Sequence, residues 1–347
     1  MKLIKTALIT GISGQDGAYL ANFLIKKKYK VIGIDRRSSR NNNFRLKYFG
    51  IENKVIIEHC DLSEFYSLER VFKKYSFNID EVYNLGAQSF VKSSFDTPIS
   101  TSDINAFGTL RILEIIRNSN KKIKFYQAST SEMFGNVNDS TLSERSVFNP
   151  QSPYAISKLY AHYITKNYRK SYGLFACSGI LFNHESPLRA EEFVTKKIIC
   201  GFVNILNKKQ DCLYLGNLYA KRDWGFAGDY VEAMWLMLQN KNPKDYVIGT
   251  GKSYSVKDFI NEAARYLKIK IRWTGKGINE KAINLDTNKI IIKIDKSNFR
   301  PSEVFFLKAN YQKAKKELKW SPKTKFKSLI KLMVDAELNI NKLIQIF

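Results

Sequence analysis

The chain has 347 residues, with 57 lysines and arginines against 32 aspartates and glutamates, so its formal net charge is +25. Hydrophobic residues make up 44% and aromatic residues 13%, which excludes intrinsic disorder as a description of the whole chain. No apolar run approaches the ~18 residues of a bilayer-spanning helix, so we expect a soluble, cytoplasmic protein with no membrane partner. At roughly 150 residues per domain, the length favours about two domains.

The first half alternates short β-branched runs with segments of helical periodicity, a pattern typical of a parallel α/β sheet. It predicts six strands, at Thr6–Thr10, Lys30–Ile34, Val55–His59, Glu81–Leu85, Ile123–Ala128 and Phe175–Phe182. It predicts helices at Ala18–Lys27, at Asp103–Asn118 and at Pro153–Tyr172. A further helix is predicted after Asp61-Leu62 and ends at about Lys74. This alternation indicates a doubly wound parallel sheet of the Rossmann class.

The second half has a mixed pattern that indicates a smaller C-terminal α/β lobe. It predicts strands near Cys212–Leu215 and at Lys289–Ile294, and helices at Asp229–Gln239, Val256–Leu267, Lys313–Leu318 and Phe326–Leu338. The polar stretch Asn183–Phe193 is expected to be a functional loop. We expect residues 1–182, with returning segments near 218–247 and 289–300, to form the larger domain, and 183–217, 248–288 and 301–347 to form the lobe.

A glycine-rich turn, Gly11-Ile12-Ser13-Gly14-Gln15-Asp16-Gly17, follows the first strand and precedes the first helix. The first glycine permits a tight turn, and the second lets the backbone approach a pyrophosphate at the helix N-terminus. The spacing is GxxGxxG, and the alternative is an ordinary turn between a strand and a helix. Its position after the first strand favours a dinucleotide site.

The second strand ends in residues that give conflicting cofactor signals. Asp35 is typical of a site for the ribose 2′-hydroxyl of NAD, whereas Arg36 and Arg37 are typical of a site for the 2′-phosphate of NADP. Two arginines followed by Ser38 and Ser39 make the better phosphate site, so the pattern favours NADP.

Tyr154 and Lys158 are four residues apart on the predicted long helix and therefore share a face. A lysine there can lower the phenol pKa and reach a cofactor ribose. Two other pairs, Tyr266/Lys270 and Tyr311/Lys315, have the same spacing, but only Tyr154/Lys158 follows the fifth strand, at whose end Glu132 is a candidate acid or base.

Other classes of site are not supported. The four cysteines form no CxxC pair and no cluster with the three histidines, which argues against a metal site or a disulfide framework. The lysines are dispersed, with no block of five or six like charges and no nucleic-acid-binding motif, so we expect no nucleic-acid partner.

Several motifs resemble the GDP-mannose 4,6-dehydratases, which are extended short-chain dehydrogenase/reductase proteins. These motifs are GISGQDGAYL (11–20), LGAQSFV (85–91), YQASTSEMFG (126–135), SPYAISKLYA (152–161), GILFNHESP (179–187), KRDWGFAGDYVEAMWLMLQ (221–239) and NFRPSEV (298–304). The resemblance covers nearly the whole chain. It implies a Rossmann domain with tightly held NADP, a lobe that binds a GDP-sugar, and a homo-oligomer, either a dimer or a tetramer.

The resemblance also assigns roles by position. The catalytic set is Thr130, Glu132, Tyr154 and Lys158. The cofactor contacts are Gly11, Ile12, Ser13, Gly14, Gln15, Asp16, Arg36, Arg37, Asp61, Leu62, Leu85, Gly86, Ala87, Gln88, Ser89, Lys158, His184 and Arg189. The nucleotide-sugar contacts are Asn183, Glu185, Lys197, Asn217, Arg222, Arg300 and Glu303, with Arg222 and Arg300 expected to hold the diphosphate.

The implied reaction converts GDP-mannose to GDP-4-keto-6-deoxy-mannose. Tyr154 takes the C4 hydroxyl proton while hydride leaves C4 for the nicotinamide. Glu132 then removes the C5 proton, water leaves from C6, and hydride returns from the cofactor to C6. The alternatives are a 4,6-dehydratase of another nucleotide sugar, such as GDP-heptose or CDP-glucose, a sugar epimerase or reductase, and a non-catalytic dinucleotide sensor. Glu132 separates the dehydratases from the 4-epimerases, which typically lack this carboxylate.

The chain departs from the family pattern at several positions. Asp35 stands where a basic or neutral residue is common, Phe226 replaces the histidine of RDWGHA, and Leu188 replaces the first arginine of PRRGE. The segment Ser38–Lys47, in a region that helps subunits of the family meet, is also atypical.

Overall fold

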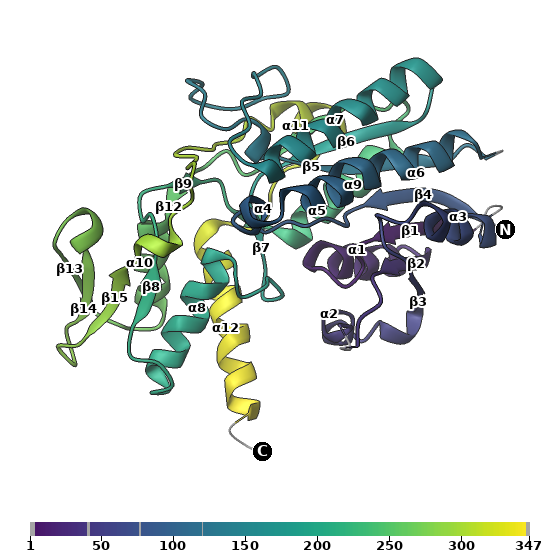
Figure 1. Ribbon diagram of the computed structural model, residues 1–347. Coiled ribbons are helices and arrows are strands. Elements are labelled where there is room, and N and C mark those ends of the chain that lie inside the picture. The colour runs from purple at the N-terminus through teal and green to yellow at the C-terminus, as the bar shows by residue number, and fades with distance from the viewer. Residues whose placement is uncertain (1–3, 40–41, 76–77, 120, 345–347) are drawn as a thin grey trace.

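The structure is a computed structural model that describes residues 4–39, 42–75, 78–119 and 121–344. A seven-stranded sheet forms its larger part (Figure 1). The strands are β1 (Thr6–Thr10), β2 (Lys30–Asp35), β3 (Val55–His59), β4 (Ile79–Asn84), β5 (Lys124–Thr130), β6 (Ala176–Leu181) and β11 (Tyr246–Ile248). Their order is β11-β6-β5-β4-β1-β2-β3, and all neighbours are parallel. The sheet confirms the predicted Rossmann class.

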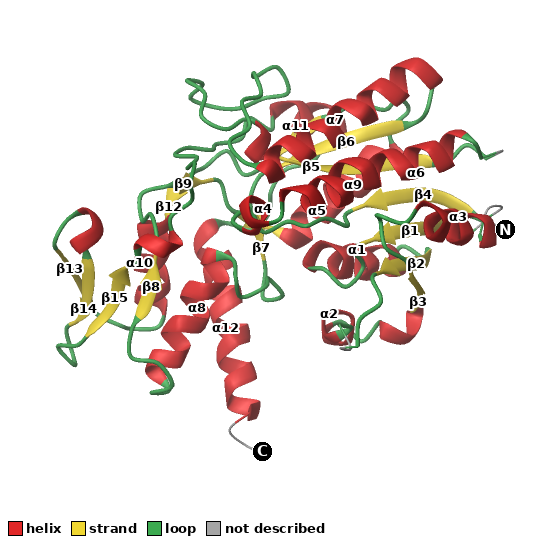
Figure 2. Cartoon of the chain, viewed as in Figure 1, coloured by secondary structure: helices red, strands yellow, loops and turns green. Residues whose placement is uncertain are grey.

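Helices cover both faces of this sheet, as Figure 2 shows. On one face, α1 (Gln15–Lys26), α9 (Ala227–Gln239) and α11 (Gln312–Leu318) pack on a core that includes Ala7 and Ile9. On the other face, α3 (Phe65–Lys74), α6 (Gly108–Arg117) and α7 (Pro153–Tyr172) pack on a core that includes Leu8. Successive residues of β1 thus face opposite layers, as the strand period of two requires.

A second, four-stranded sheet supports the smaller lobe. Its order is β13 (Ile271–Thr274), β14 (Lys281–Asn284), β15 (Ile290–Ile294) and β8 (Leu213–Leu215). Three helices pack on it around a separate core: α8 (Val194–Leu206), α10 (Val256–Tyr266) and α12 (Phe326–Ile344). In Figure 1 this lobe lies at the left of the large sheet.

Short elements complete the fold. Two-residue strands form the pairs β7 (His184–Glu185) with β10 (Gly225–Phe226), and β9 (Lys221–Arg222) with β12 (Tyr254–Ser255). The helices α2 (Phe44–Tyr48), α4 (Ser93–Asp96) and α5 (Pro98–Ser102) are one turn long, and a π-helical turn over Asp103–Phe107 precedes α6. The predicted helix over Asp103–Asn118 is therefore divided. Within the described residues, no helix is both long and apolar enough to cross a membrane.

Four segments differ from the expected organisation. The segment 289–300 was expected with the larger domain, but β15 pairs with β14 and β8 in the small sheet. Part of 301–347 was expected in the lobe, but α11 packs beside β11 and α9, and Ala314, Leu318 and Trp320 belong to the core of the large sheet. The seventh strand and α8 were not expected. A three-residue strand such as β11 is too short to show a period.

Candidate active site

A cavity of about 690 Å³ lies where the carboxyl ends of β1, β2, β4, β5 and β6 meet the lobe. Every expected site residue lines this cavity except Ile12 and Arg37. The Ile12 side chain is fully buried, because it packs against Gly33 of β2, and Arg37 is exposed. Ligands of open α/β sheets bind at this edge, outside the carboxyl ends of the strands.

The glycine turn comes very close to a second loop. Gly11 has a φ of +69°, and a Cβ on it would lie 2.9 Å from the Cα of Gly86. Gly14 caps α1 with no side-chain hydrogen bond to the helix, so the first N–H groups of the helix face the cavity without a side-chain partner. This geometry fits a pyrophosphate, which needs close backbone approach and N–H donors.

Asp35 at the end of β2 is already engaged by the protein. Its Oδ1 accepts hydrogen bonds from the Ser13 hydroxyl and the Arg36 N–H, both at 2.9 Å. Arg45, which the sequence pattern did not single out, donates to the Ser13 carbonyl at 3.0 Å and to the Leu188 carbonyl at 2.8 Å. Arg45 thereby ties the glycine turn to the loop that follows β7.

An ion pair between Asp16 and His184 bridges α1 and β7. The His184 Nε2 lies 2.7 Å from Asp16 Oδ2, and its Nδ1 lies 2.8 Å from the Phe182 carbonyl. Burial alone lowers the pKa of His184, but the Asp16 carboxylate outweighs it and the pKa is raised. Burial likewise acts against the Asp16 carboxylate, yet His184 keeps the Asp16 pKa below its ordinary value. The pair therefore favours an imidazolium beside a carboxylate.

Tyr154 and Lys158 lie together on α7 at the end of β5, and both are buried. Burial raises the pKa of Tyr154 to about 12, although a hydrogen bond with Thr130 acts in the opposite direction. Burial lowers the pKa of Lys158 to about 8, and its ammonium donates to the Ala128 carbonyl at 3.0 Å. The expected lowering of the Tyr154 pKa is thus absent, because burial dominates in the protein alone.

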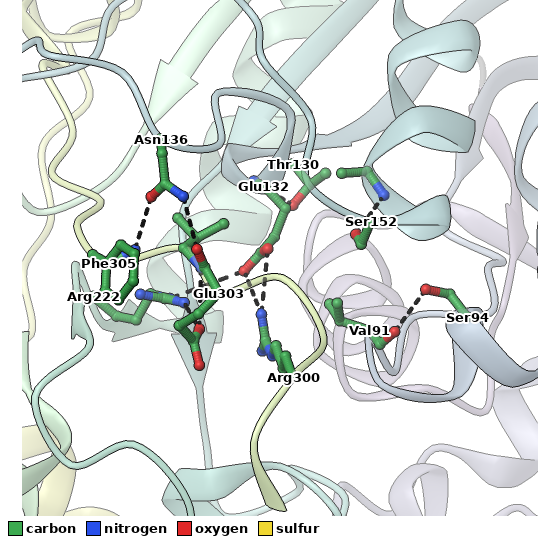
Figure 3. Close-up of polar contacts among 12 residues, drawn as sticks. Val91, Ser94, Thr130, Glu132, Asn136, Ser152, Arg222, Arg300, Glu303 and Phe305 are labelled. Carbon is green, nitrogen blue, oxygen red and sulfur yellow. Dashed lines mark hydrogen bonds and ion pairs between the residues drawn. The ribbon is translucent and has the colours of Figure 1, made fainter. Parts of the chain in front are cut away.

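Glu132 lies in a cluster of charged side chains, which Figure 3 shows. Its N–H donates to the Thr130 hydroxyl at 3.2 Å, and its buried carboxylate lies 3.4 Å from Arg300 Nη1 through both oxygens. Arg222 Nε lies 3.9 Å from Glu132, and Arg222 Nη2 lies 3.3 Å from Glu303. Both arginines expected at the diphosphate therefore contact carboxylates here.

Other expected sugar-side residues have fixed partners as well. Glu185 is buried, accepts from the Thr195 hydroxyl at 2.6 Å and lies 3.1 Å from Arg189 Nε. Lys197 lies 3.5 Å from Asn298 Oδ1. In contrast, the buried Asn183 Oδ1 and Gln88 Oε1 have no hydrogen-bond partner among the described residues. Buried polar atoms of this kind indicate positions that a ligand can satisfy.

Two cavity residues to which the sequence analysis gave no role are Lys92 and Asn298. Lys92 donates to the Ser297 carbonyl at 2.6 Å and so holds the loop 295–303 at the cavity. The signal for Lys92 and Asn298 was present, since one directly follows the motif at 85–91 and the other begins the motif at 298–304.

The glycine turn at β1, the Tyr-Lys pair on α7 and the added lobe define an extended short-chain dehydrogenase/reductase type of protein. The family described as GDP-mannose 4,6 dehydratase matches residues 8–333, and the chain belongs to that family. The predicted resemblance is thereby confirmed.

Relatives match over nearly their full length. The chain is 47% identical to a GDP-mannose 4,6-dehydratase of Vibrio cholerae, over 96% of this chain and 94% of that protein. It is 45% identical to the GDP-mannose 4,6 dehydratase of Homo sapiens, over 97% and 92%. It is 48% identical to GDP-mannose 4,6 dehydratase 1 of Arabidopsis thaliana, over 97% and 91%.

Solved structures share the fold at lower identity. A dTDP-glucose 4,6-dehydratase from Bacillus anthracis, in complex with NAD, has a TM-score of 0.80 at 21% identity, covering 97% of this chain and 98% of that one. A UDP-glucose 4-epimerase from Thermotoga maritima has a TM-score of 0.81 at 23% identity, covering 97% and 99%. These similarities establish the fold, which dehydratases and epimerases share.

Proposed function

We propose that this protein converts GDP-mannose to GDP-4-keto-6-deoxy-mannose and water, with NADP as a recycled cofactor and with Thr130, Glu132, Tyr154 and Lys158 as the catalytic residues. The observation that carries the proposal is the position of Glu132. It lies in the same cavity as the Tyr154/Lys158 pair, and a 4-epimerase needs no base at C5. Family membership supports the same substrate.

The cofactor half of the cavity fits a nicotinamide dinucleotide. Backbone N–H groups at Gly14–Asp16 would hold the pyrophosphate, and Lys158 would hold the nicotinamide ribose. NADP is favoured over NAD because Arg36 lines the cavity, while Ser13 and the Arg36 N–H already occupy one oxygen of Asp35. When bound, the nicotinamide supplies a reversible hydride acceptor, so the sugar is oxidised at C4 and reduced at C6 with no net oxidation.

The chain's own residues move the protons. Tyr154 accepts the C4 hydroxyl proton, and the Lys158 ammonium stabilises the phenolate that this requires. Thr130 orients the phenol through its hydroxyl. Once C4 is a ketone, the C5 proton is acidic, and Glu132 accepts it and passes it to the C6 hydroxyl, which leaves as water. C5 regains a proton when hydride is added to C6. Arg222 and Arg300 hold the diphosphate, and the lobe binds the rest of the nucleotide.

We also propose that the protein is a homo-oligomer and acts in the cytoplasm. Ile156, Tyr160 and Tyr163 on α7 and Phe107 beside them are exposed apolar side chains, at 57%, 38%, 50% and 47%, which supports a subunit contact. The four cysteines are unpaired, which fits a reducing compartment.

A panel of nucleotide sugars tests the proposed function. Purified protein is incubated with GDP-mannose, GDP-heptose or CDP-glucose, and mass spectrometry records the loss of one water. GDP-mannose is expected to give the dehydrated product, and the cofactor released by denaturation is expected to be NADP. Dehydration of another sugar but not of GDP-mannose would refute the substrate assignment, and release of NAD alone would refute the cofactor assignment.

A further inference from the structure

The charged cluster around Glu132 contains two carboxylates and two guanidinium groups, so its formal charges cancel. Its two arginines are held very differently. Arg222 has a side chain that is only 7% exposed, and it donates to the Lys221 carbonyl at 3.1 Å and contacts Glu303. Arg222 is therefore fixed by several partners.

Among the described residues, Arg300 makes hydrogen bonds and ion pairs only with Glu132. One nitrogen, Nη1, contacts both oxygens of Glu132 at 3.4 Å, and within the described residues the other guanidinium nitrogens have no hydrogen bond. The Arg300 side chain is 28% exposed and belongs to the loop 295–303 rather than to a helix or strand. Both its long contacts and its position leave it able to change partner, since a partly exposed ion pair contributes little stability.

The backbone of Glu132 is held in place, and its carboxylate is the group that the proposed reaction uses. Its N–H is bonded to Thr130, so only its carboxylate can change partners. Both carboxylate oxygens of Glu132 lie 3.4 Å from Arg300 Nη1, so a substrate proton must compete with this guanidinium for the same two oxygens. The contact with Arg300 thus opposes the role proposed for Glu132.

A diphosphate is a stronger partner for an arginine than one carboxylate. It carries more charge and accepts two parallel hydrogen bonds from the guanidinium fork. We propose that the substrate diphosphate competes with Glu132 for Arg300, so that nucleotide binding takes Arg300 away and releases Glu132 to act as the base. This inference rests on the proposed function, because it takes Glu132 as the base and a nucleoside diphosphate as the ligand.

The competition predicts an unusual effect on binding, which is measured with GDP and without turnover. Removing the charge of the competitor, with Glu132→Gln, should tighten GDP binding to the cofactor-saturated protein by about three- to tenfold, as measured by titration calorimetry. Arg300→Ala should weaken GDP binding. In the Arg300→Ala background, Glu132→Gln should change GDP affinity by less than about twofold.

Glu192→Gln is the matched control, because it removes the same charge from a residue that lines the same cavity. Among the contacts between described residues, Glu192 has none with Arg300. Glu192→Gln should change GDP affinity by less than about twofold. The inference is overturned if Glu132→Gln weakens GDP binding, if it tightens binding equally without Arg300, or if Glu192→Gln tightens it as much. If any of these results is found and the wild-type protein still dehydrates GDP-mannose, only this inference is refuted and the proposed function stands. Wild-type protein that binds no GDP refutes the proposed function as well.

Discussion

The two halves of the cavity differ in what lines them, which is backbone in one half and charged side chains in the other. The half around the glycine turn is made of backbone, with Gly11 packed against Gly86 and the N-terminus of α1 facing inward. The half toward the lobe is made of charged side chains, where Glu132 meets Arg300 from a segment far along the chain. Backbone packing fixes one geometry, because steric contacts allow no alternative, whereas ion pairs can exchange partners. The first half is therefore ready for its ligand and the second can respond to it.

The largest expected effect is on the responsive half. Glu132→Gln keeps the shape of the side chain but cannot accept the C5 proton, so turnover should fall by roughly 10²–10⁴. Oxidation at C4 should still occur, and reduced nicotinamide should accumulate beside a 4-keto sugar that keeps its 6-hydroxyl. Single-turnover absorbance with enzyme in excess measures the reduced nicotinamide, and mass spectrometry measures the 4-keto sugar.

Tyr154→Phe is the control for this prediction. It removes the group that takes the C4 hydroxyl proton, so no reduced nicotinamide should appear. If Glu132→Gln still releases dehydrated product at a near-normal rate, another residue is the base.

The second prediction tests whether the other half is fixed by backbone packing. Gly11→Ala places a Cβ 2.9 Å from Gly86 at a positive φ, and should lower the free energy of unfolding by about 2–4 kcal/mol and weaken cofactor binding. Gly173→Ala has a similar φ of +66° but no atom within 4 Å, and should cost about 1 kcal/mol. Denaturant unfolding compares the two, and equal losses would mean that the contact with Gly86 is unimportant.

The third prediction concerns Lys158, which lies between the two halves. Its pKa is about 8 in the folded protein against an ordinary 10.5, so the unfolded chain binds more protons between these values. Stability from this group should therefore rise as the pH increases from 8 to 10.5, by about 3 kcal/mol in all. Lys158→Met should remove that part of the slope. Denaturation midpoints measured from pH 8 to 10.5 give this dependence for both proteins. If stability rises equally with pH in the wild-type protein and in Lys158→Met, the lowered pKa of Lys158 is wrong.

The smallest expected effect separates the two arginines after β2. Arg36→Ala should weaken NADP binding by at least about tenfold while NAD binding changes little, because it loses hydrogen bonds to a phosphate. Arg37, which does not line the cavity, serves as the matched control, and Arg37→Ala should have an effect below about threefold. Fluorescence titration with both cofactors measures this, and equal affinity of the wild-type protein for NAD and NADP would contradict the preference.

Much of the large domain could be predicted because its signals are local. The six predicted strands appear in the sheet, and the glycine turn and Tyr154/Lys158 lie at its carboxyl edge. The strand at β15 was predicted, but its assignment to the larger domain was wrong because its pairing is non-local, and the short strand β11 was not predicted. β15 resembles any apolar strand, and nothing in its own residues says which sheet it joins. α11 likewise packs with the large sheet only because β11 forms the edge beside it.

The sequence by itself determined the residue types at the site, the turn that approaches a pyrophosphate, and the family, since these depend on local order along the chain. Only the tertiary structure decided which charged and polar groups meet. The pairing of Glu132 with Arg300, of Asp16 with His184, and of Arg45 with Ser13 and Leu188 joins residues that are far apart in the chain. Burial, which comes from the packing of whole layers, set the pKa of Tyr154 and Lys158 in directions that spacing on one helix could not indicate.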